Sequence, residues 1–215
     1  MSIAWQIAVA VAGYLMGSIP TGYLVARSRG VDIRKAGSGN IGATNVLRVL
    51  GKPAGILVLG IDPLKGALAC WLLPTAAIAL AGAGAAPGVE GLRIVAGLAA
   101  ILGHNYTCWL RFKGGKGIAT SAGVLLVWMP AALGLALLVW VLVFLVSGYV
   151  SLASILAAFA LPFIVWLTGG SGTLITVAAV LGALAIYKHR SNIQRLRAGT
   201  EHRFRRSRTD GAQPA

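Results

Sequence analysis

Long apolar runs dominate the sequence and limit the folds that it can adopt. They lie near residues 3–25, 54–81, 92–110, 118–146, 152–168 and 173–187. Several of these runs reach about 20 residues, the length of helix that crosses the hydrocarbon core of a bilayer. Because 57% of the residues are hydrophobic, only 11% are charged and the mean hydropathy is +0.81, the composition excludes an ordinary soluble domain. The sequence therefore predicts an all-α, polytopic membrane protein.

The positions of the basic residues predict how the chain crosses the membrane, since short cytoplasmic loops are rich in Lys and Arg. These residues gather after the first apolar run, after the third run and after Tyr187, whereas Arg93 lies in a gap expected on the other side. If Pro130 divides the run 118–146 into two spans, all the basic segments face the cytoplasm. We therefore expect seven transmembrane helices with Gly-rich cytoplasmic loops, an external N-terminus and a cytoplasmic C-terminus. The first run has no preceding Lys or Arg and extends past residue 20, so we expect a retained span rather than a signal peptide.

The domain organisation is expected to be simple. Residues 1–201 are predicted to form one seven-span domain, and residues 202–215 a basic, disordered cytoplasmic tail. The net charge of +14 is interpreted as an orientation signal, and the tail as a contact for anionic lipid headgroups rather than nucleic acid. Cys70 and Cys108 have no second Cys or His at metal-ligand spacing, so we expect both to be inert packing residues.

The segment GSGNIGATNVLR, residues 37–48, is the most polar part of an otherwise apolar region. Its glycines allow backbone N–H groups to turn inward and approach a ligand closely. Neutral hydrogen-bonding side chains accompany the glycines, and Arg48 adds a planar fork suited to phosphate oxygens. The residues of this predicted phosphate cradle are Gly37, Ser38, Gly39, Asn40, Gly42, Thr44, Asn45 and Arg48. The alternative is a simple turn beside the membrane.

The segment KGGKG, residues 113–117, repeats the same combination of glycines and cations at the start of a predicted helix. The positive end of a helix dipole favours an anion at that position. Lys113, Gly114, Gly115 and Lys116 are therefore candidates for a second anion site. The alternative is that both lysines only anchor the loop on the cytoplasmic side.

Several kinds of chemistry lack support in the sequence. There is no Walker A pattern, no G-x-S-x-G, no H-E-x-x-H and no carboxylate pair, so we expect no ATP site, no metal site and no cofactor. His104 is interpreted as a structural residue near a helix end. His189 lies in a polar cluster with Lys188, Arg190 and Asn192, where a substrate ligand or a general base is plausible.

Four segments together resemble a known family: GSIPTGYLVA followed by GSGNIGATNVLR, GHNYTCWLRFKGGKGIAT, YVSLAS and KHRSNIQRLRAGTE. They are similar, in the same order, to the bacterial acyl-phosphate:glycerol-3-phosphate acyltransferases of the membrane-integral PlsY type. The resemblance implies a seven-span enzyme of the bacterial inner membrane with a cytoplasmic active site. It further implies transfer of a fatty acyl group from acyl phosphate to the 1-position hydroxyl of glycerol 3-phosphate, which gives lysophosphatidic acid and phosphate for phospholipid synthesis.

The resemblance also implies roles for particular residues. Catalytic roles are implied for Ser38, Arg48, His189 and Asn192. Substrate-binding roles are implied for Gly39, Asn40, Gly42, Thr44, Asn45, Lys113, Gly114, Gly115, Lys116 and Ser151. Glu201 matches a residue expected to be structural. The chain departs from the family pattern at Gly148, because an Arg commonly precedes the Tyr at this place.

The expected partners are two small phosphorylated substrates and membrane lipid, and the oligomeric state is left open. The chain lacks the H-x-x-x-x-D motif of the other large acyltransferase class, since residue 109 is Trp and residue 194 is Gln. That difference favours acyl phosphate as the donor. The sequence leaves open whether His189 or a substrate phosphate removes the proton. A membrane transporter for a phosphorylated solute is the alternative function, and a non-enzymatic membrane scaffold is a third possibility.

Overall fold

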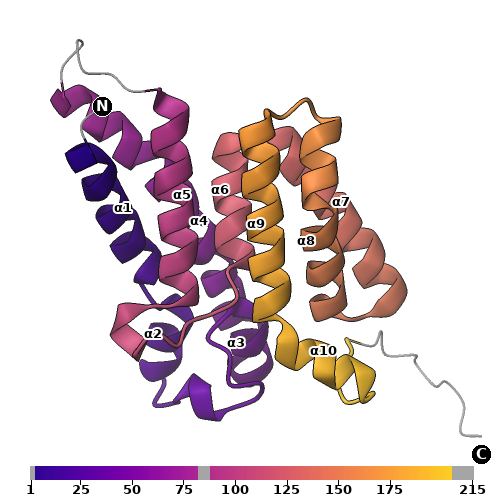
Figure 1. Cartoon of the computed structure of the whole chain (residues 1–215). Coiled ribbons are helices and arrows are strands. Elements are labelled where there is room, and N and C mark those ends of the chain that lie inside the picture. Colours follow the sequence, from indigo (N-terminus) through magenta and orange to yellow (C-terminus); the bar gives the residue numbers. More distant parts are fainter. Residues whose placement is uncertain (1–2, 82–87, 205–215) are drawn as a thin grey trace, which may run out of the picture. The chain divides into compact units, whose positions relative to one another are not determined.

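The computed structural model describes residues 3–81 and 88–204 (Figure 1). Within these ranges the regular structure is entirely helical, so the all-α prediction is confirmed. The helices form two compact units, one ending at Leu133 and the other beginning at Gly134. The predicted tail lies largely at residues 205–215, outside the described residues.

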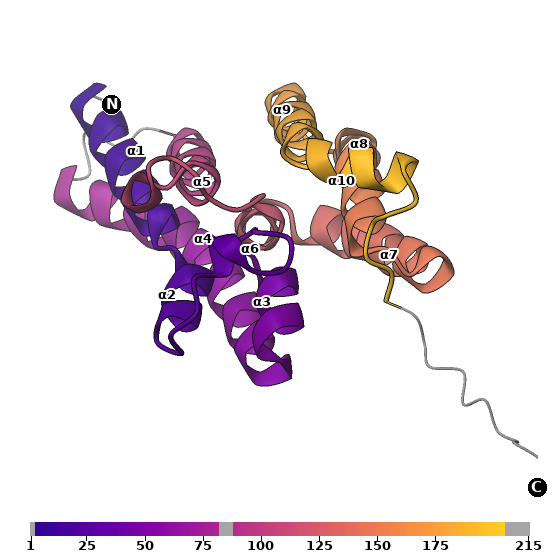
Figure 2. The same ribbon diagram turned by 90° about the horizontal axis from the view of Figure 1, so that it is seen from below.

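The first unit contains the two Gly-rich segments. Its helices, with the short 3₁₀ turns η1 and η2, are α1 (Ile3–Ser18), α2 (Thr21–Arg27), η1 (Ile33–Lys35), α3 (Ala43–Leu50), α4 (Lys52–Ala81), α5 (Val89–Asn105), η2 (Cys108–Leu110) and α6 (Ile118–Trp128). The α1 helix packs along α5, and α4 packs against α1, α3, α5 and α6. Viewed from below, α3 lies beside α4 (Figure 2). The long α4 helix is therefore the centre of this unit.

Glycines allow the helices of the first unit to approach one another closely. A Cβ atom on Gly17 would overlap the backbone of Ala100 on α5. On α4, a Cβ atom on Gly66 would overlap the carbonyl oxygen of Thr120 on α6. Small residues at such crossings are a common means of helix packing in membranes. Close helix contact is therefore what requires glycine at these positions.

The second unit consists of α7 (Pro130–Ser147), α8 (Val150–Leu167), α9 (Gly172–Lys188) and α10 (Arg190–Arg197), with the first turn of α7 preceding its boundary. The α8 and α9 helices pack together, and α10 bends away from α9 by 56° at His189 (Figure 2). A single residue, Met129, separates α6 from α7, so the run 118–146 is divided into two helices beside Pro130, and of these only α7 is long enough to be a candidate span.

The described helices have the length and the surface of a membrane protein. Four stretches are long and apolar enough to cross a bilayer, Ile3–Arg27, Lys52–Ala81, Pro130–Ser147 and Val150–Leu167, and the bent pair of α9 and α10 makes a fifth when it is counted as one span. Large apolar side chains such as Leu145 and Val146 are exposed on these helices. Such a surface suits contact with lipid rather than with water. A helical membrane protein is therefore confirmed, with four to five spans by length and composition.

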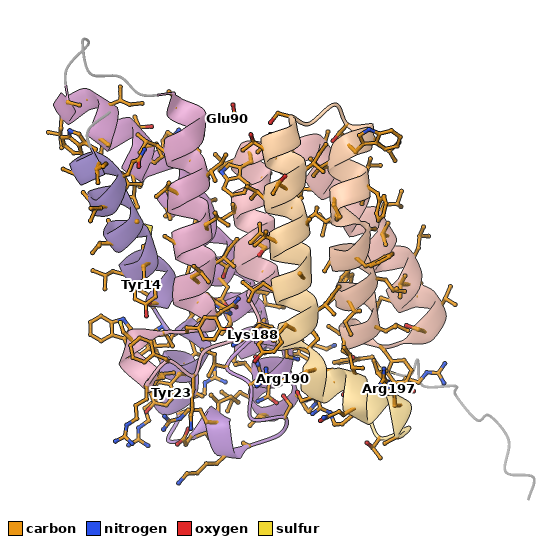
Figure 3. All side chains as sticks on the ribbon, viewed as in Figure 1. Tyr14, Tyr23, Glu90, Lys188, Arg190 and Arg197 are labelled. Carbon is orange, nitrogen blue, oxygen red and sulfur yellow. The ribbon has the colours of Figure 1, made fainter. Side chains whose placement is uncertain are left out.

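Charged side chains gather at one end of each unit (Figure 3). In the first unit, Tyr23 of α2 lies at the end that also carries α3 and η1, whereas Glu90 lies at the far end of α5 (Figure 3). An apolar cluster that includes Ile33, Ile41, Val46 and Leu110 holds the segment 33–46 against η2. Because η2 leads into the KGGKG segment, both Gly-rich segments lie at the same end of the first unit.

Candidate active site

Asn45 organises the first Gly-rich segment from within. Its side chain is 2% exposed, and its Oδ1 atom accepts a hydrogen bond of 2.8 Å from the backbone N–H of Ser38. Its Nδ2 atom donates to the carbonyl oxygens of Ala36 and Asn40 at 3.0 and 2.8 Å. These bonds close the loop around the amide group. The structure therefore gives Asn45 a loop-forming position within the predicted cradle.

The glycines of this loop meet specific geometric demands. Gly37 and Gly39 have φ angles of +58° and +71°, a region that favours glycine. A Cβ atom on Gly37 would also overlap Oδ1 of Asn45. Ser38 between them is exposed. Backbone geometry, as the sequence predicts, is what requires glycine at positions 37 and 39.

The loop ends at the start of α3, where the first-turn amides lie beside predicted site residues. The side chain of Asn40 accepts a hydrogen bond of 2.8 Å from the N–H of Gly42, which fixes the turn into the helix. Gly42 is the N-cap residue and has no side chain with which to cap α3. Thr44 lies in the first turn, and one turn later Arg48 donates from Nη1 to Oδ1 of Asn45 at 3.4 Å. The helix start can therefore receive an anion flanked by the Arg48 guanidinium.

The KGGKG segment lies directly on the last turn of α5. The N–H groups of Gly114 and Gly115 donate to the carbonyl oxygens of Asn105 and His104 at 3.2 and 3.0 Å. A Cβ atom on Gly114 would overlap the His104 carbonyl oxygen, and one on Gly115 would overlap Nε2 of the His104 ring. Neither glycine is among the described residues with positive φ. Close packing against α5 is therefore what requires glycine at these two positions.

The lysines of this segment lie on either side of the packed glycines. Lys113 is exposed and Lys116 is half-buried. Gly117, with a φ angle of +80°, is the N-cap residue of α6 and provides no side-chain cap. The start of α6 thus resembles the start of α3, since a glycine precedes each helix and cations lie nearby. Both predicted anion sites of the first unit therefore coincide with a helix start.

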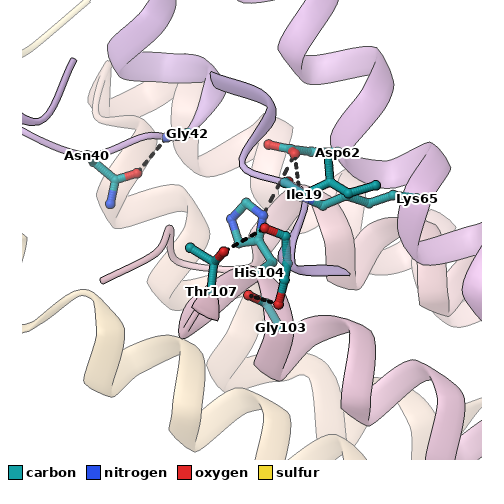
Figure 4. A network of polar contacts seen from close by, with 9 residues as sticks. Ile19, Asn40, Gly42, Asp62, Lys65, Gly103, His104 and Thr107 are labelled. Atoms are coloured by element: carbon teal, nitrogen blue, oxygen red, sulfur yellow. Dashed lines mark hydrogen bonds and ion pairs between the residues drawn. The ribbon is translucent and has the colours of Figure 1, made fainter. Parts of the chain in front are cut away.

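A buried group of charged side chains lies where α4 meets His104 of α5 (Figure 4). On α4, the Asp62 carboxylate is 2.8 Å from the Lys65 ammonium group, and the two side chains are 2% and 5% exposed. Nδ1 of His104 lies 3.7 Å from the same carboxylate oxygen of Asp62. Lys65 also donates to the carbonyl oxygen of Ile19, in the break between α1 and α2, at 2.8 Å. Sequence reasoning missed this group, although opposite charges three residues apart in an apolar helix are a recognisable signal.

His189 lies at the bend between α9 and α10 in the second unit. Its side chain is 3% exposed, and Nδ1 lies 2.8 Å from the carbonyl oxygen of Ala185. Because a carbonyl oxygen can only accept, Nδ1 carries a proton in this contact. The neutral ring then has its lone pair on Nε2, which is the nitrogen able to accept a proton. The neighbouring Arg190 guanidinium lies over the ring of Tyr187, 4.8 Å from its centroid.

Glu201 connects the remaining predicted residues of the second unit. Its carboxylate, 8% exposed, accepts hydrogen bonds of 2.7 Å from Asn192 and 2.6 Å from Arg195. Burial raises the pKa of Glu201, but the polar groups of Asn192, Ser151 and Arg195 around the carboxylate outweigh it, and the net shift of the pKa is downward. The hydroxyl of Ser151 is buried and makes no hydrogen bond of ordinary geometry within the described residues. Glu201 thus brings Asn192 and Ser151 together, as a structural residue would.

The departure at Gly148 has a structural counterpart in this chain. Gly148 has a φ angle of +72°, and its carbonyl oxygen accepts a hydrogen bond of 2.8 Å from the N–H of Phe204. Arg203 donates from Nε to the carbonyl oxygen of Ser147 at 2.9 Å, and its guanidinium lies over the ring of Tyr149. An arginine therefore does contact this tyrosine, but it comes from the segment after Glu201.

The structure thus groups the predicted site residues within each unit. The loop residues 38–48 and the KGGKG segment lie at one end of the first unit, and Ser151, His189 and Asn192 lie near the α9–α10 bend or Glu201 in the second. Among the described residues, no group of His, Cys, Asp and Glu side chains is arranged to hold a metal ion. The side chains that these segments offer include hydrogen-bond donors, cations and two histidines, His104 and His189.

Comparison with known proteins gives consistent matches along nearly the whole chain. The family model described as glycerol-3-phosphate acyltransferase matches residues 7–199. A glycerol-3-phosphate acyltransferase from Geotalea daltonii is 47% identical over 206 residues, covering 94% of this chain and 98% of the relative. The corresponding protein from Aquifex aeolicus is 45% identical and covers 90% and 96%.

Solved structures match the fold as well as the sequence. The crystal structure of PlsY, an integral membrane glycerol 3-phosphate acyltransferase, in its glycerol 3-phosphate form has a TM-score of 0.83 and 41% identity, and covers 93% of this chain and 96% of that one. The lysophosphatidic acid form of PlsY has a TM-score of 0.80 and 40% identity, with 93% and 95% covered.

Proposed function

Because the chain belongs to the glycerol-3-phosphate acyltransferase family, we propose that it acylates the 1-position hydroxyl of sn-glycerol 3-phosphate, with acyl phosphate as the donor. The products are lysophosphatidic acid and inorganic phosphate. The observation that carries the proposal is the pair of glycine-capped helix starts, at α3 and α6, which lie at the same end of the first unit and are flanked by cations. Two phosphorylated substrates require two such sites.

Each anion site has a proposed substrate. The loop 37–48 receives the acyl phosphate, with Arg48 and the amides at the start of α3 facing its phosphate oxygens. The KGGKG segment receives the phosphate of glycerol 3-phosphate, with Lys113 and Lys116 as cations. Fixed donors and cations of this kind hold two anions close together despite their mutual repulsion. Asn40, Gly42 and Asn45 maintain the loop that carries Ser38, Gly39 and Thr44.

The reaction needs no metal and no covalent enzyme intermediate, because an acyl phosphate is already activated. The hydroxyl oxygen of glycerol 3-phosphate attacks the carbonyl carbon, the bond between that carbon and the phosphate oxygen breaks, and phosphate leaves with the electron pair. Nε2 of His189 accepts the hydroxyl proton, and a phosphate oxygen of the substrate is the alternative acceptor. Asn192 and Ser151, both linked to Glu201, orient substrate hydroxyl or phosphate groups.

The proposed setting is the bacterial inner membrane. We propose that residues 1–201 form one seven-span catalytic domain in which α5 and α6 also cross the membrane, with an external N-terminus and a cytoplasmic C-terminus. The gathering of cations after α2, after η2 and after α9 supports this orientation. A reporter fused after Glu201 should be cytoplasmic and one inserted at Gly88 external. Two reporters on the same side would contradict this topology.

Transport of a phosphorylated solute is the competing function. Transporter sites usually lie near the middle of the bilayer on broken helices, whereas the Gly-rich segments here lie at one end of the first unit. Purified protein in liposomes, supplied with glycerol 3-phosphate and acyl phosphate, distinguishes the two. Formation of lysophosphatidic acid with equal release of phosphate supports the acyltransferase. Accumulation of glycerol 3-phosphate in the vesicles without any product would contradict it.

A further inference from the structure

We propose that Asp62 is a positioning residue for the acyltransferase reaction, acting through His104 on the KGGKG segment. The inference rests on the proposed binding of glycerol 3-phosphate at that segment. It starts from the buried charges on α4, which have no part in the chemistry described above. Ionisable groups within membrane-spanning helices are costly, and their presence points to a function.

Contacts connect α4 to the KGGKG segment through His104, and Figure 4 shows the part that joins Asp62, Lys65 and His104. The Asp62 carboxylate faces the Lys65 ammonium group at 2.8 Å and Nδ1 of His104 at 3.7 Å. The opposite edge of the His104 ring, at Nε2, lies against Gly115 so closely that a Cβ atom there would overlap it. The carbonyl oxygen of His104 also accepts the N–H of Gly115 at 3.0 Å. The orientation of the His104 ring therefore sets where the segment lies.

Further bonds fix the end of α5 that carries His104. Thr107 donates to the carbonyl oxygen of Ser18 at 2.6 Å, and the Ser18 hydroxyl donates to that of Gly103 at 3.3 Å. Lys65 reaches the same break in the first span, through the carbonyl oxygen of Ile19 at 2.8 Å. The backbone around His104 is thus held by several bonds, and the ring orientation is what the Asp62 carboxylate adds.

A buried ion pair gives little net stability, because the loss of hydration offsets the attraction between the charges. Removing one partner leaves an uncompensated charge, whereas removing both restores much of the stability. A structural role and a positioning role therefore predict different results for the single and double replacements. If the role is structural, the double replacement restores stability and substrate binding together. If the role is positioning, the double replacement restores stability only.

The test compares Asp62→Asn with the double variant Asp62→Asn/Lys65→Met in the purified full-length protein. The readouts are thermal stability in detergent and the steady-state constants for glycerol 3-phosphate, with acyl phosphate saturating. KM does not depend on the fraction of protein that is folded, so it reports on the site itself. Glu90→Gln, at the far end of α5, is the matched control, because it also removes one acidic side chain but lies away from the KGGKG segment.

We expect Asp62→Asn to lower thermal stability and to raise KM for glycerol 3-phosphate about tenfold, with a smaller change in kcat, because the charge that faces the His104 ring is lost. The double variant should recover stability but keep the raised KM, and Glu90→Gln should match the wild type. Recovery of KM together with stability, or an unchanged KM in Asp62→Asn, would overturn the inference.

If Asp62→Asn gives no folded protein, the double variant decides the question alone, because a raised KM supports the positioning role and an unchanged KM contradicts it. The wild-type control separates this inference from the proposed function. A wild-type protein that forms no lysophosphatidic acid contradicts the function, whereas an active wild type with unchanged variants contradicts only the role of Asp62.

Discussion

Replacing the two glycines of the KGGKG segment tests whether it binds glycerol 3-phosphate. A Cβ atom on Gly114 would overlap the carbonyl oxygen of His104 and lie 2.8 Å from the carbonyl carbon of Asn105. Both obstacles are backbone atoms at the end of α5, so the segment itself must move, by about 1 Å. A displacement of that size costs up to about 100-fold in reaction rate. The extra Cβ atom on Gly115 meets only the end of the His104 side chain, which can rotate away more easily than backbone atoms can move.

We therefore expect Gly114→Ala to lower kcat/KM about 100-fold and Gly115→Ala about tenfold. Both losses should appear mainly as a higher KM for glycerol 3-phosphate, because the phosphate contact exists in the ground state and in the transition state. Gly60→Ala is the control, since a Cβ atom there meets nothing within 4 Å. The assay is initial-rate kinetics in detergent with each substrate varied in turn. If Gly114→Ala loses kcat while its KM for glycerol 3-phosphate stays unchanged, the assignment of the segment is refuted.

Three further predictions concern the supports of the site. Asn45→Ala removes the hydrogen-bonding partner of the Ser38 N–H and of several carbonyl groups. The free energy of unfolding in detergent should therefore fall by about 2 to 3 kcal/mol. A fall of less than about 0.5 kcal/mol, which is typical of surface replacements, would contradict the loop-forming role of Asn45. Because the pKa of Glu201 is lowered on folding, its carboxylate stabilises the fold above its ordinary pKa in the unfolded chain, and this stability is lost as the pH falls through the lower folded pKa. Glu201→Gln should therefore flatten the acid side of a plot of unfolding temperature against pH, and parallel acid limbs for the two proteins would contradict that. Arg203→Ala should make the segment after Glu201 more accessible to limited proteolysis, whereas Arg197→Ala, at an exposed position of α10, should not. Equal cleavage of both variants would show that the contact of Arg203 with Ser147 is dispensable.

Much of the helical architecture follows from the sequence, because apolar runs and prolines have direct structural consequences. The division at Pro130 is an example, since α6 ends and α7 begins around it. The break at Ile19 and Pro20 was not predicted, because the run 3–25 was interpreted as one continuous span, although Pro20 stands between Ser18 and Thr21 within it. The number of spans is also harder to predict, since the 17 residues of α5 and the 11 residues of α6 are short for a helix that crosses a bilayer.

The candidate site was predicted in outline, but the reasons for its residues differ from those that the sequence suggests. Composition locates the Gly-rich segments, and positive φ angles at Gly37 and Gly39 agree with a tight loop. The same composition does not reveal that Gly114 and Gly115 donate their N–H groups to the end of α5 rather than pointing them outward. Such contacts join residues distant in sequence, as does the path from Asp62 to His104, and a single sequence carries no direct signal of them.

The most direct test of the proposed reaction is to follow each oxygen of a labelled acyl phosphate. The donor is prepared with a heavy-oxygen label only in the bridging position, between the carbonyl carbon and phosphorus, and is incubated with purified protein, glycerol 3-phosphate and a metal chelator. Attack at the carbonyl predicts lysophosphatidic acid free of label, with all of the label in the released phosphate, at an undiminished rate. Activity that needs an acyl thioester donor, loss of the reaction in chelator, or label retained in the lipid product would contradict the account.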